Sequence, residues 1–415
     1  MLERLVSAFG ALVMLALAFA LCPPRLRSSV RPRTVGVGLA VLLGIAVLVL
    51  RTPLNGLFSV ANDVVEQLLA FTRKGTQFVF GGLVADPKTF GFIFAVQVLP
   101  TILFFSALMS VLYYVRVMPA IITASGRLLS RALGTSGAES FSTIADVFVG
   151  QTEAPLVVRP YLPRMTASEL NACMVAGYAT TAGGVLAAYV AMLSASVPGI
   201  AGHLIASSVM SAPASLVIAK LIFPESGAPE TTGKARVELP HVSANLLDAI
   251  AVGTTDGLRL AVNVGAMLIV FIAFTAALDA LLGAAGAWFG LALTLERVFA
   301  WVFAPLAWLL GVPGPDVIKV GTLLGQKTVF NEFIAYSRMS EMLATDAGWL
   351  TERGRLIASY ALCGFANFGS IGIQIAGYSS LAPERRADIS KLAFRAMIGG
   401  LLATCLVACV AGMLL

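Results

Sequence analysis

The chain has 415 residues, of which 58% are hydrophobic and only 12% are charged, and its mean hydropathy is +0.89. A soluble globular domain carries about 25% charged residues, so this composition excludes that class and indicates a polytopic membrane protein. The formal net charge of +6 fits arginine-rich cytoplasmic loops better than nucleic-acid binding.

Eight segments of the chain are long and apolar enough to cross a bilayer, which takes about 20 residues per helix. Only helices and closed barrels satisfy their backbone hydrogen bonds in lipid. We therefore predict an all-α polytopic membrane protein with eight transmembrane helices, at residues 5–21, 35–50, 90–115, 167–195, 200–223, 258–285, 353–378 and 388–415.

Charged residues around the first span predict its direction. Glu3 and Arg4 precede the apolar run, and four arginines follow it, at positions 25, 27, 31 and 33. Positive charge collects on the cytoplasmic side of a membrane, so we expect the N-terminus outside and no signal-peptide cleavage. An even number of spans then leaves both termini outside.

Between the spans, three segments are amphipathic and are expected to lie on the membrane interface: residues 56–75, 117–133 and 293–311. The loop at 224–245 is the most polar stretch and should be solvated. The five cysteines lie mostly in apolar runs without CxxC spacing, so we interpret them as small core residues.

Residues 137–164 and 313–343 are apolar, but a glycine and a polar cluster interrupt each of them near the middle. The clusters are Gly150–Gln151–Thr152–Glu153 in the first and residues 325–332 in the second. Such a pattern predicts two re-entrant helical hairpins, because irregular backbone at membrane depth must be buried in protein or line a cavity.

Short stretches of the two halves resemble each other. "VGQTEAP" in the first hairpin echoes "LGQKTVF" in the second, and "GYATTAGGV" (177–185) echoes "GFANFGSIG" (364–372) in the spans that follow. A hairpin followed by a glycine-broken span, found twice, predicts a transporter built from an inverted repeat with its site near the midplane. The alternative is that these short glycine-rich matches arise by chance in a sequence of biased composition.

Polar residues gather at these interruptions: Asp146, residues 151–153, Thr180–Thr181, Asn331–Glu332, and Asn367 with Ser370. An ionisable group inside the membrane costs at least about 2.5–3.5 kcal/mol, so it indicates function unless it forms a structural polar contact between helices. Carboxylates, amides and hydroxyls suit a neutral, polyhydroxylated or heterocyclic solute. No HExxH or GxSxG motif indicates an enzyme, and rings of like groups that would line a channel are not evident.

The motifs "GQTEAP", "NEF", "GFANFGSI" and "GYATTAGGVLAAYV" resemble the concentrative nucleoside transporter family, from about residue 35 to the end of the chain. The resemblance implies an ion-coupled nucleoside symporter of the bacterial inner membrane that works as a homotrimer by alternating access. It also implies a scaffold, mainly at 1–134 and 224–312, and two transport repeats, at 135–223 and 313–415. A transporter of the same fold for a free nucleobase or a sugar is the alternative.

The resemblance also assigns roles to single residues. The residues expected to bind the nucleoside are Gln151, Thr152, Glu153, Val185, Glu332, Phe365, Asn367 and Ser370. A sodium site is expected at Asp146, Val149, Thr180 and Thr181, and no cofactor is expected. Many sodium-coupled members have Asn where this chain has Asp146, so sodium and proton coupling both remain open.

Overall fold

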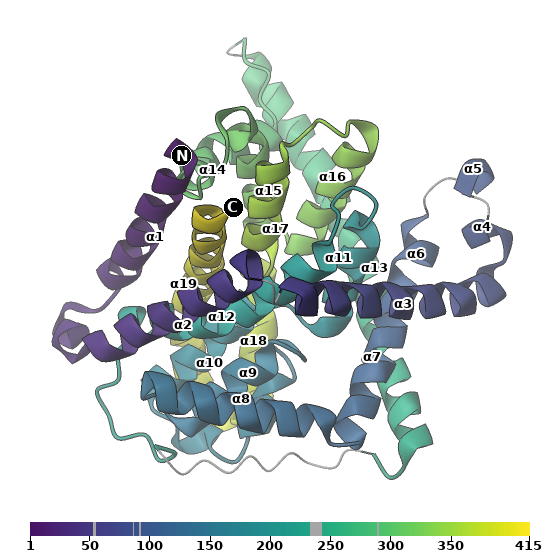
Figure 1. Cartoon of the computed structure of the whole chain (residues 1–415). Coiled ribbons are helices and arrows are strands. Elements are labelled where there is room, and N and C mark those ends of the chain that lie inside the picture. Colours follow the sequence, from purple (N-terminus) through teal and green to yellow (C-terminus); the bar gives the residue numbers. More distant parts are fainter. Residues whose placement is uncertain (53–54, 86, 91–92, 233–242, 289) are drawn as a thin grey trace.

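The computed structural model describes the chain except for residues 53–54, 86, 91–92, 233–242 and 289 (Figure 1). Throughout this described part the secondary structure is helical, with no strand, as the sequence predicts. The predicted polar loop at 224–245 lies partly outside the described residues.

The first half of the chain forms α1 (Leu2–Ala20), α2 (Pro32–Arg51), α3 (Asn55–Phe80), α4 (Gly82–Ala85), α5 (Pro87–Phe90), α6 (Phe94–Gln97), α7 (Leu99–Tyr114), α8 (Val117–Leu133), α9 (Gly137–Asp146), α10 (Ala167–Ala179) and α11 (Gly183–Leu193). The second half forms α12 (Ile200–Ile222), α13 (Leu246–Ala287), α14 (Leu295–Leu309), α15 (Val317–Val329), α16 (Glu332–Thr345), α17 (Glu352–Leu362), α18 (Phe368–Leu381) and α19 (Arg386–Leu414). Short 3₁₀ segments at Pro24–Ser29, Ala154–Val158, Leu162–Arg164, Gly314–Asp316 and Pro383–Arg385 connect them.

The described residues contain seven helical segments that are long and apolar enough to span a membrane, and these match seven of the eight predicted spans. One of these spans comprises α10 and α11, and another comprises α6 and α7. The remaining predicted span, 353–378, is divided into α17 and α18 by an irregular stretch at 363–367. That division falls at the glycine-rich motif where the sequence predicted a broken helix.

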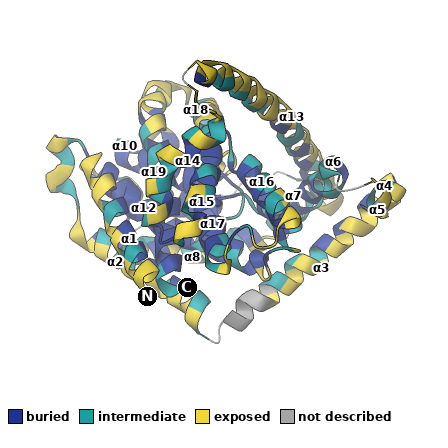
Figure 2. Cartoon of the chain, turned by 90° about the horizontal axis from the view of Figure 1, so that it is seen from above, coloured by how far each residue is buried: buried dark blue, intermediate teal, exposed yellow. Residues whose placement is uncertain are grey.

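Burial separates central from peripheral helices (Figure 2). In the apolar windows of α10–α11 and α12, 89% of residues are buried, against 11% in α13. The centre therefore consists of α10, α12, α15, α17 and α19, while α1, α2, α3 and α13 lie at the rim. An apolar helix with exposed side chains on most of its surface fits contact with lipid or with another protein surface.

Helix α13 differs most from its predicted bounds. It begins at Leu246 rather than near residue 258, because Asn245 caps it by accepting a hydrogen bond from the Asp248 backbone N–H at 2.9 Å. The amphipathic segments do form helices, as α3, α8 and α14. In α8 the buried residues recur every three or four positions (118, 122, 126, 129 and 133), so one face of this helix packs on the bundle.

The two predicted hairpins differ in their returning arms. The first consists of α9, an irregular tip at 147–153, and 3₁₀ turns at Ala154–Val158 and Leu162–Arg164. Prolines at 155, 160 and 163 explain why this arm is not an α-helix, because proline removes backbone donors and clashes with the preceding turn. The second hairpin has two α-helical arms, α15 and α16, that meet at residues 330–331.

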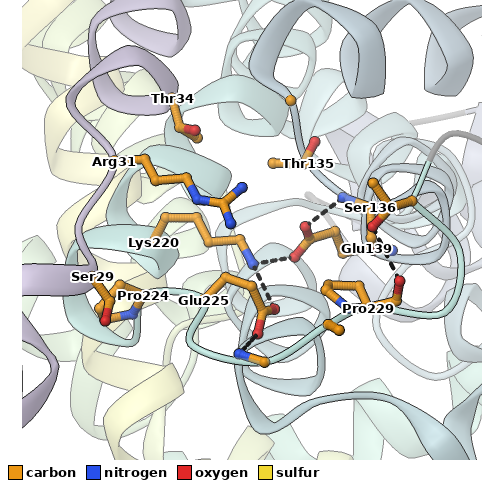
Figure 3. Close-up of a pocket in the computed structure, with 14 residues that line it drawn as sticks. Ser29, Arg31, Thr34, Thr135, Ser136, Glu139, Lys220, Pro224, Glu225 and Pro229 are labelled. Carbon is orange, nitrogen blue, oxygen red and sulfur yellow. Dashed lines mark hydrogen bonds and ion pairs between the residues drawn. The ribbon is translucent and has the colours of Figure 1, made fainter.

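A buried ion-pair cluster fixes the foot of the first hairpin (Figure 3). The Lys220 Nζ at the end of α12 lies 2.6 Å from Glu139 Oε2 in α9 and 3.8 Å from Glu225 Oε2. The same ammonium donates to Ser168 Oγ in α10 at 2.9 Å. Because Glu139 also completes the capping box of α9 with Ser136, this cluster ties three helices together at one end of the bundle.

Candidate substrate-binding site

A cavity of about 1260 Å³ lies where the irregular stretches of four helix pairs converge. Its wall includes residues from the tip of the first hairpin, from the α10–α11 break, from the α15–α16 break and from the α17–α18 break. Residues of the continuous helices α7, α8 and α13 complete the wall. The cavity is thus lined both by polar, partly unwound segments and by continuous helices.

All eight residues expected to bind substrate line this one cavity: Gln151, Thr152, Glu153, Val185, Glu332, Phe365, Asn367 and Ser370. Two of them, Glu153 and Glu332, come from different hairpins. The two hairpins therefore each bring a carboxyl group to the same cavity.

Two asparagines explain how the broken helices point into the cavity. Asn331 caps α16 by accepting from the Ile334 N–H at 2.9 Å, and Asn367 caps α18 by accepting from the Ser370 N–H at 2.8 Å. Both helices therefore begin at the cavity wall. The positive ends of their dipoles favour oxygen-rich or negatively charged groups there.

The Glu332 carboxylate receives two hydrogen bonds from neighbouring helices. Tyr189 Oη donates to Oε1 at 2.9 Å, and Asn367 Nδ2 donates to Oε2 at 3.2 Å. An ionised carboxylate has about four acceptor positions, so some remain for donors of a ligand. Glu332 therefore forms an acceptor pole of the cavity, suited to hydroxyl groups.

Gln151 has the opposite polarity. Its Nε2 donates to Ser370 Oγ at 3.1 Å, and its Oε1 accepts from Gln374 Nε2 at 3.1 Å. The hydroxyl proton of Ser370 is free to donate elsewhere. A ligand group beside the Gln151 NH₂ would meet its remaining proton, which suits a carbonyl oxygen or a ring nitrogen lone pair.

Close backbone contact joins the first hairpin to the α10–α11 break. The Gly183 N–H donates to the Phe148 carbonyl at 2.9 Å. Gly150 has φ +89°, and a Cβ there would lie 2.8 Å from the Ala182 Cβ. Glycine is required at position 150 both for its backbone conformation and for this close approach.

The four residues expected to bind sodium lie on these same two elements but do not all face the cavity. Val149 lines it, whereas Asp146, Thr180 and Thr181 are fully buried. Both carboxylate oxygens of Asp146 have no hydrogen-bond partner among the described residues. A buried, unpaired carboxylate fits a cation that takes oxygen ligands, although the Thr180 hydroxyl donates to its own helix, at Ala176 O.

Lys327, which could have neutralised a carboxylate of its own hairpin, has different contacts. Its fully buried ammonium donates to Ala361 O at 2.7 Å and to Thr404 Oγ1 at 3.0 Å. Ala361 is in the last turn of α17, where unpaired carbonyl groups favour a cation. Lys327 therefore links the second hairpin to α17 and α19.

Further polar residues of this region were not predicted from the sequence, among them Asp256 and Asn263 of α13, which line the cavity. Tyr189 binds Glu332, Gln374 binds Gln151, and Tyr113 of α7 lines the cavity with a hydroxyl that has no partner among the described residues. The available signal was a single polar group within an apolar helix. Such a signal does not tell which other helix the side chain faces.

Three family models match consecutive parts of the chain. They are described as the N-terminus of Na+ dependent nucleoside transporters (residues 9–83), a gate domain for nucleoside recognition (95–196) and the C-terminus of Na+ dependent nucleoside transporters (203–412). The chain belongs to the sodium-dependent, concentrative nucleoside transporter family. The predicted resemblance is thereby confirmed.

Relatives from distant organisms align with nearly the whole length of this chain. A Haemophilus influenzae protein described as a transporter is 45% identical over 99% of this chain and 97% of its own length. The rat sodium/nucleoside cotransporter 1 is 40% identical over 99% of this chain, which spans 64% of that longer protein.

Solved structures of one family member have the same fold. CNTnw in an inward-facing, substrate-bound state matches with a TM-score of 0.91 and 42% identity, over 99% of this chain and 98% of that chain. A CNTnw variant in an outward-facing state matches with a TM-score of 0.94 and 41% identity, over 100% and 99% of the two chains. One nucleoside transporter architecture therefore exists in states open to opposite sides.

Proposed function

We propose that this chain is a sodium-coupled symporter that imports nucleosides across the bacterial inner membrane by alternating access. The observation that carries this proposal is the single cavity that joins a donor pole at Gln151 with an acceptor pole at Glu332. A nucleoside matches both groups, because its base carries acceptors for the Gln151 amide and its ribose carries hydroxyl donors for the Glu332 carboxylate.

The bound nucleoside would lie with its ribose at the second hairpin and its base at the first. Glu332, Asn367 and Ser370 would receive the ribose, and Phe365 would lie beside the base. The remaining base contacts would come from the hairpin tip and the α10–α11 break: Gln151, Thr152, Glu153 and Val185. Hydrogen bonds to the nucleoside would replace the hydrogen bonds that these polar groups make with water in the empty cavity.

The coupling ion would bind next to the substrate, between the first hairpin and the α10–α11 break. Asp146, Val149, Thr180 and Thr181 would surround it. Binding a cation there would neutralise the unpaired Asp146 carboxylate and hold the hairpin tip in its ordered position. The ion would thereby complete the substrate site.

Alternating access would use a division of the chain into two parts. The transport repeats at 135–223 and 313–415 would move against a scaffold formed by 1–134 and 224–312. The exposed apolar surface of α13 would face lipid or another protomer in a homotrimer, with both chain termini periplasmic.

Sodium coupling can be tested by measuring uridine uptake into proteoliposomes with sodium or with choline at one fixed pH. We expect uptake against a gradient only with sodium. For Asp146→Ala, the sodium concentration for half-maximal uptake should rise about tenfold or more, the effect of losing one charge-assisted contact. Full uptake in choline would exclude sodium as the coupling ion.

Substrate class can be tested by competition. Unlabelled uridine should inhibit uptake of labelled uridine, whereas equal concentrations of uracil or ribose should not, since each occupies only one pole of the cavity. Stronger inhibition by uracil or by ribose than by uridine would instead support a nucleobase or sugar transporter.

A further inference from the structure

Gln374 is a buried glutamine on α18, 1% exposed, that lies outside the substrate cavity. It follows Ser370 by one helical turn, so both side chains are on the same face of α18. Its Nε2 donates two hydrogen bonds, one to Gln151 Oε1 at 3.1 Å and one to the Met174 carbonyl of α10 at 3.1 Å. Gln374 thus connects the first hairpin to two helices.

The Met174 carbonyl determines the direction of this whole chain of hydrogen bonds. Amide groups are oriented by their hydrogen-bond network, and a backbone carbonyl can only accept. The NH₂ end of Gln374 must therefore face α10. The second proton of that NH₂ group then requires the carbonyl end of Gln151, so the NH₂ end of Gln151 is left to face Ser370 and the cavity.

A glycine makes this contact possible. Gly177 lies one turn after Met174 on α10, and a Cβ at this position would lie 2.7 Å from Gln374 Nε2 and 2.9 Å from Gln151 Cβ. Any other residue at 177 would separate the two amides. The glycine of the "GYATTAGGV" motif therefore has a specific role in packing.

We propose that Gln374 is a positioning residue that holds Gln151 as a hydrogen-bond donor and so sets the transporter's preference for base edges that carry an acceptor. The inference rests on the proposed function, because Gln151 must contact the base. It assigns a determinant of substrate preference to a side chain that itself does not touch the substrate.

The test compares binding of uridine with binding of two uridine analogues in which the 2-oxo or the 4-oxo oxygen is replaced by hydrogen. For the wild-type protein in saturating sodium, loss of the oxygen that faces Gln151 should weaken binding about fivefold to tenfold, the factor for one neutral hydrogen bond. In Gln374→Met, which has similar side-chain length but no donor, this difference should fall below about twofold. Gln374→Leu provides a second variant of the same kind.

Gln374→Glu gives a sharper outcome. Because the Met174 carbonyl can only accept, it favours the protonated form of the introduced carboxyl group. This form can donate to Met174 O and accept from the NH₂ end of Gln151. Gln151 would then turn its carbonyl to the cavity. The preference between uridine and cytidine, whose 4-position carries an acceptor and a donor respectively, should shift toward cytidine relative to wild type.

Gln326→Leu is the matched control, because Gln326 is a buried glutamine of the second hairpin that does not line the cavity. It should discriminate between the analogues as wild type does. Unchanged discrimination in both Gln374→Met and Gln374→Leu would overturn the inference, as would loss of all uridine binding in both folded variants. The inference would also be overturned if the wild-type protein bound uridine and both analogues equally well. If the wild-type protein bound no nucleoside, the proposed function itself would be refuted.

Discussion

Among single residues, Glu332 combines burial at the cavity wall with two hydrogen bonds to its carboxylate. It is 4% exposed, lies in the first turn of α16, and receives donors from Tyr189 and Asn367. The two donors orient the carboxyl group at the helix N-terminus without using all its acceptor positions. The residue is therefore held in place and still able to bind hydroxyl groups.

We expect Glu332→Gln to weaken nucleoside binding about tenfold to a hundredfold, the factor for one hydrogen bond to a charged group. The amide keeps the size of the side chain but removes the charge that attracts the ribose hydroxyls. Isothermal titration with uridine in sodium would measure this change.

Glu341→Gln on the same helix is the control for that experiment. Glu341 is exposed and pairs with Arg338 at 3.3 Å, and such surface pairs contribute about 0–1 kcal/mol. Its variant should bind uridine like wild type. Equal binding by Glu332→Gln and wild type would remove Glu332 from the site.

At the scale of elements, the site depends on how closely the interrupted segments approach one another. The contacts Phe148 O to Gly183 N and Gln151 to Gln374 both join the first hairpin to other helices. Each contact needs a small residue nearby, Gly150 in the first case and Gly177 in the second.

Gly150→Ala should reduce uptake strongly while the protein remains folded. The added Cβ would meet Ala182 at 2.8 Å, and overpacking of this kind costs about 1–3 kcal/mol. The hairpin tip should therefore shift away from α11. Initial rates of uridine uptake, normalised to the amount of inserted protein, would report this.

Gly134→Ala separates the steric effect from backbone strain. Gly134 also has a left-handed backbone, with φ +67°, but a Cβ there would meet nothing within 4 Å. Its variant should transport normally with slightly lower stability. Similar losses in both variants would mean that backbone conformation, and not close packing at the tip, is what matters.

The Lys220 cluster predicts a stability effect remote from the cavity (Figure 3). Lys220→Met leaves Glu139 buried without its partner, and breaking a buried pair this way costs about 3–5 kcal/mol. The midpoint of thermal unfolding in detergent should fall clearly. Adding Glu139→Gln should restore much of the loss, because the fully buried partner of Lys220 then carries no charge. A double variant as unstable as Lys220→Met would contradict this account.

For the whole molecule, the central property is the expected movement of the transport repeats against the scaffold. In the proposed division, α11 belongs to a transport repeat and α7 to the scaffold. The two helices lie in contact, because a Cβ at Gly184 would be 3.3 Å from Ser106 Oγ. A sulfur placed at the Ser106 Oγ position would therefore lie close to the Cβ of residue 184, as disulfide geometry requires.

The double variant Ser106→Cys/Gly184→Cys should therefore lose uptake on oxidation and recover it on reduction, because the bond would hold α11 against α7. Each single variant serves as a control and should respond little to either treatment, given that the native cysteines are buried. If the oxidised double variant transports as fast as its chemically reduced form, α7 and α11 belong to the same rigid part.

The sequence by itself determined the class of molecule and the location of its polar groups. Apolar runs of membrane length require helices, and costly groups such as Glu153 and Glu332 within them require a shared polar site, because lipid offers no partner. Motifs shared between the two halves and with a transporter family were enough to name eight residues that line the cavity, but not Tyr113 or the lining residues of α13. The nearly continuous span at 353–378 and the early start of α13 were harder, because composition fixes neither a helix break nor a helix cap to the residue.

Only the tertiary structure decided which polar groups face each other. Gln374 reaches Gln151 and Met174 from a distant part of the chain, and the direction of that contact depends on one backbone carbonyl. The same holds for Lys327, whose partners lie on α17 and α19 and not on its own hairpin. A hydrogen bond forms within about 3 Å and with a definite direction, so its partner is set by the packing of whole helices, which no local pattern specifies.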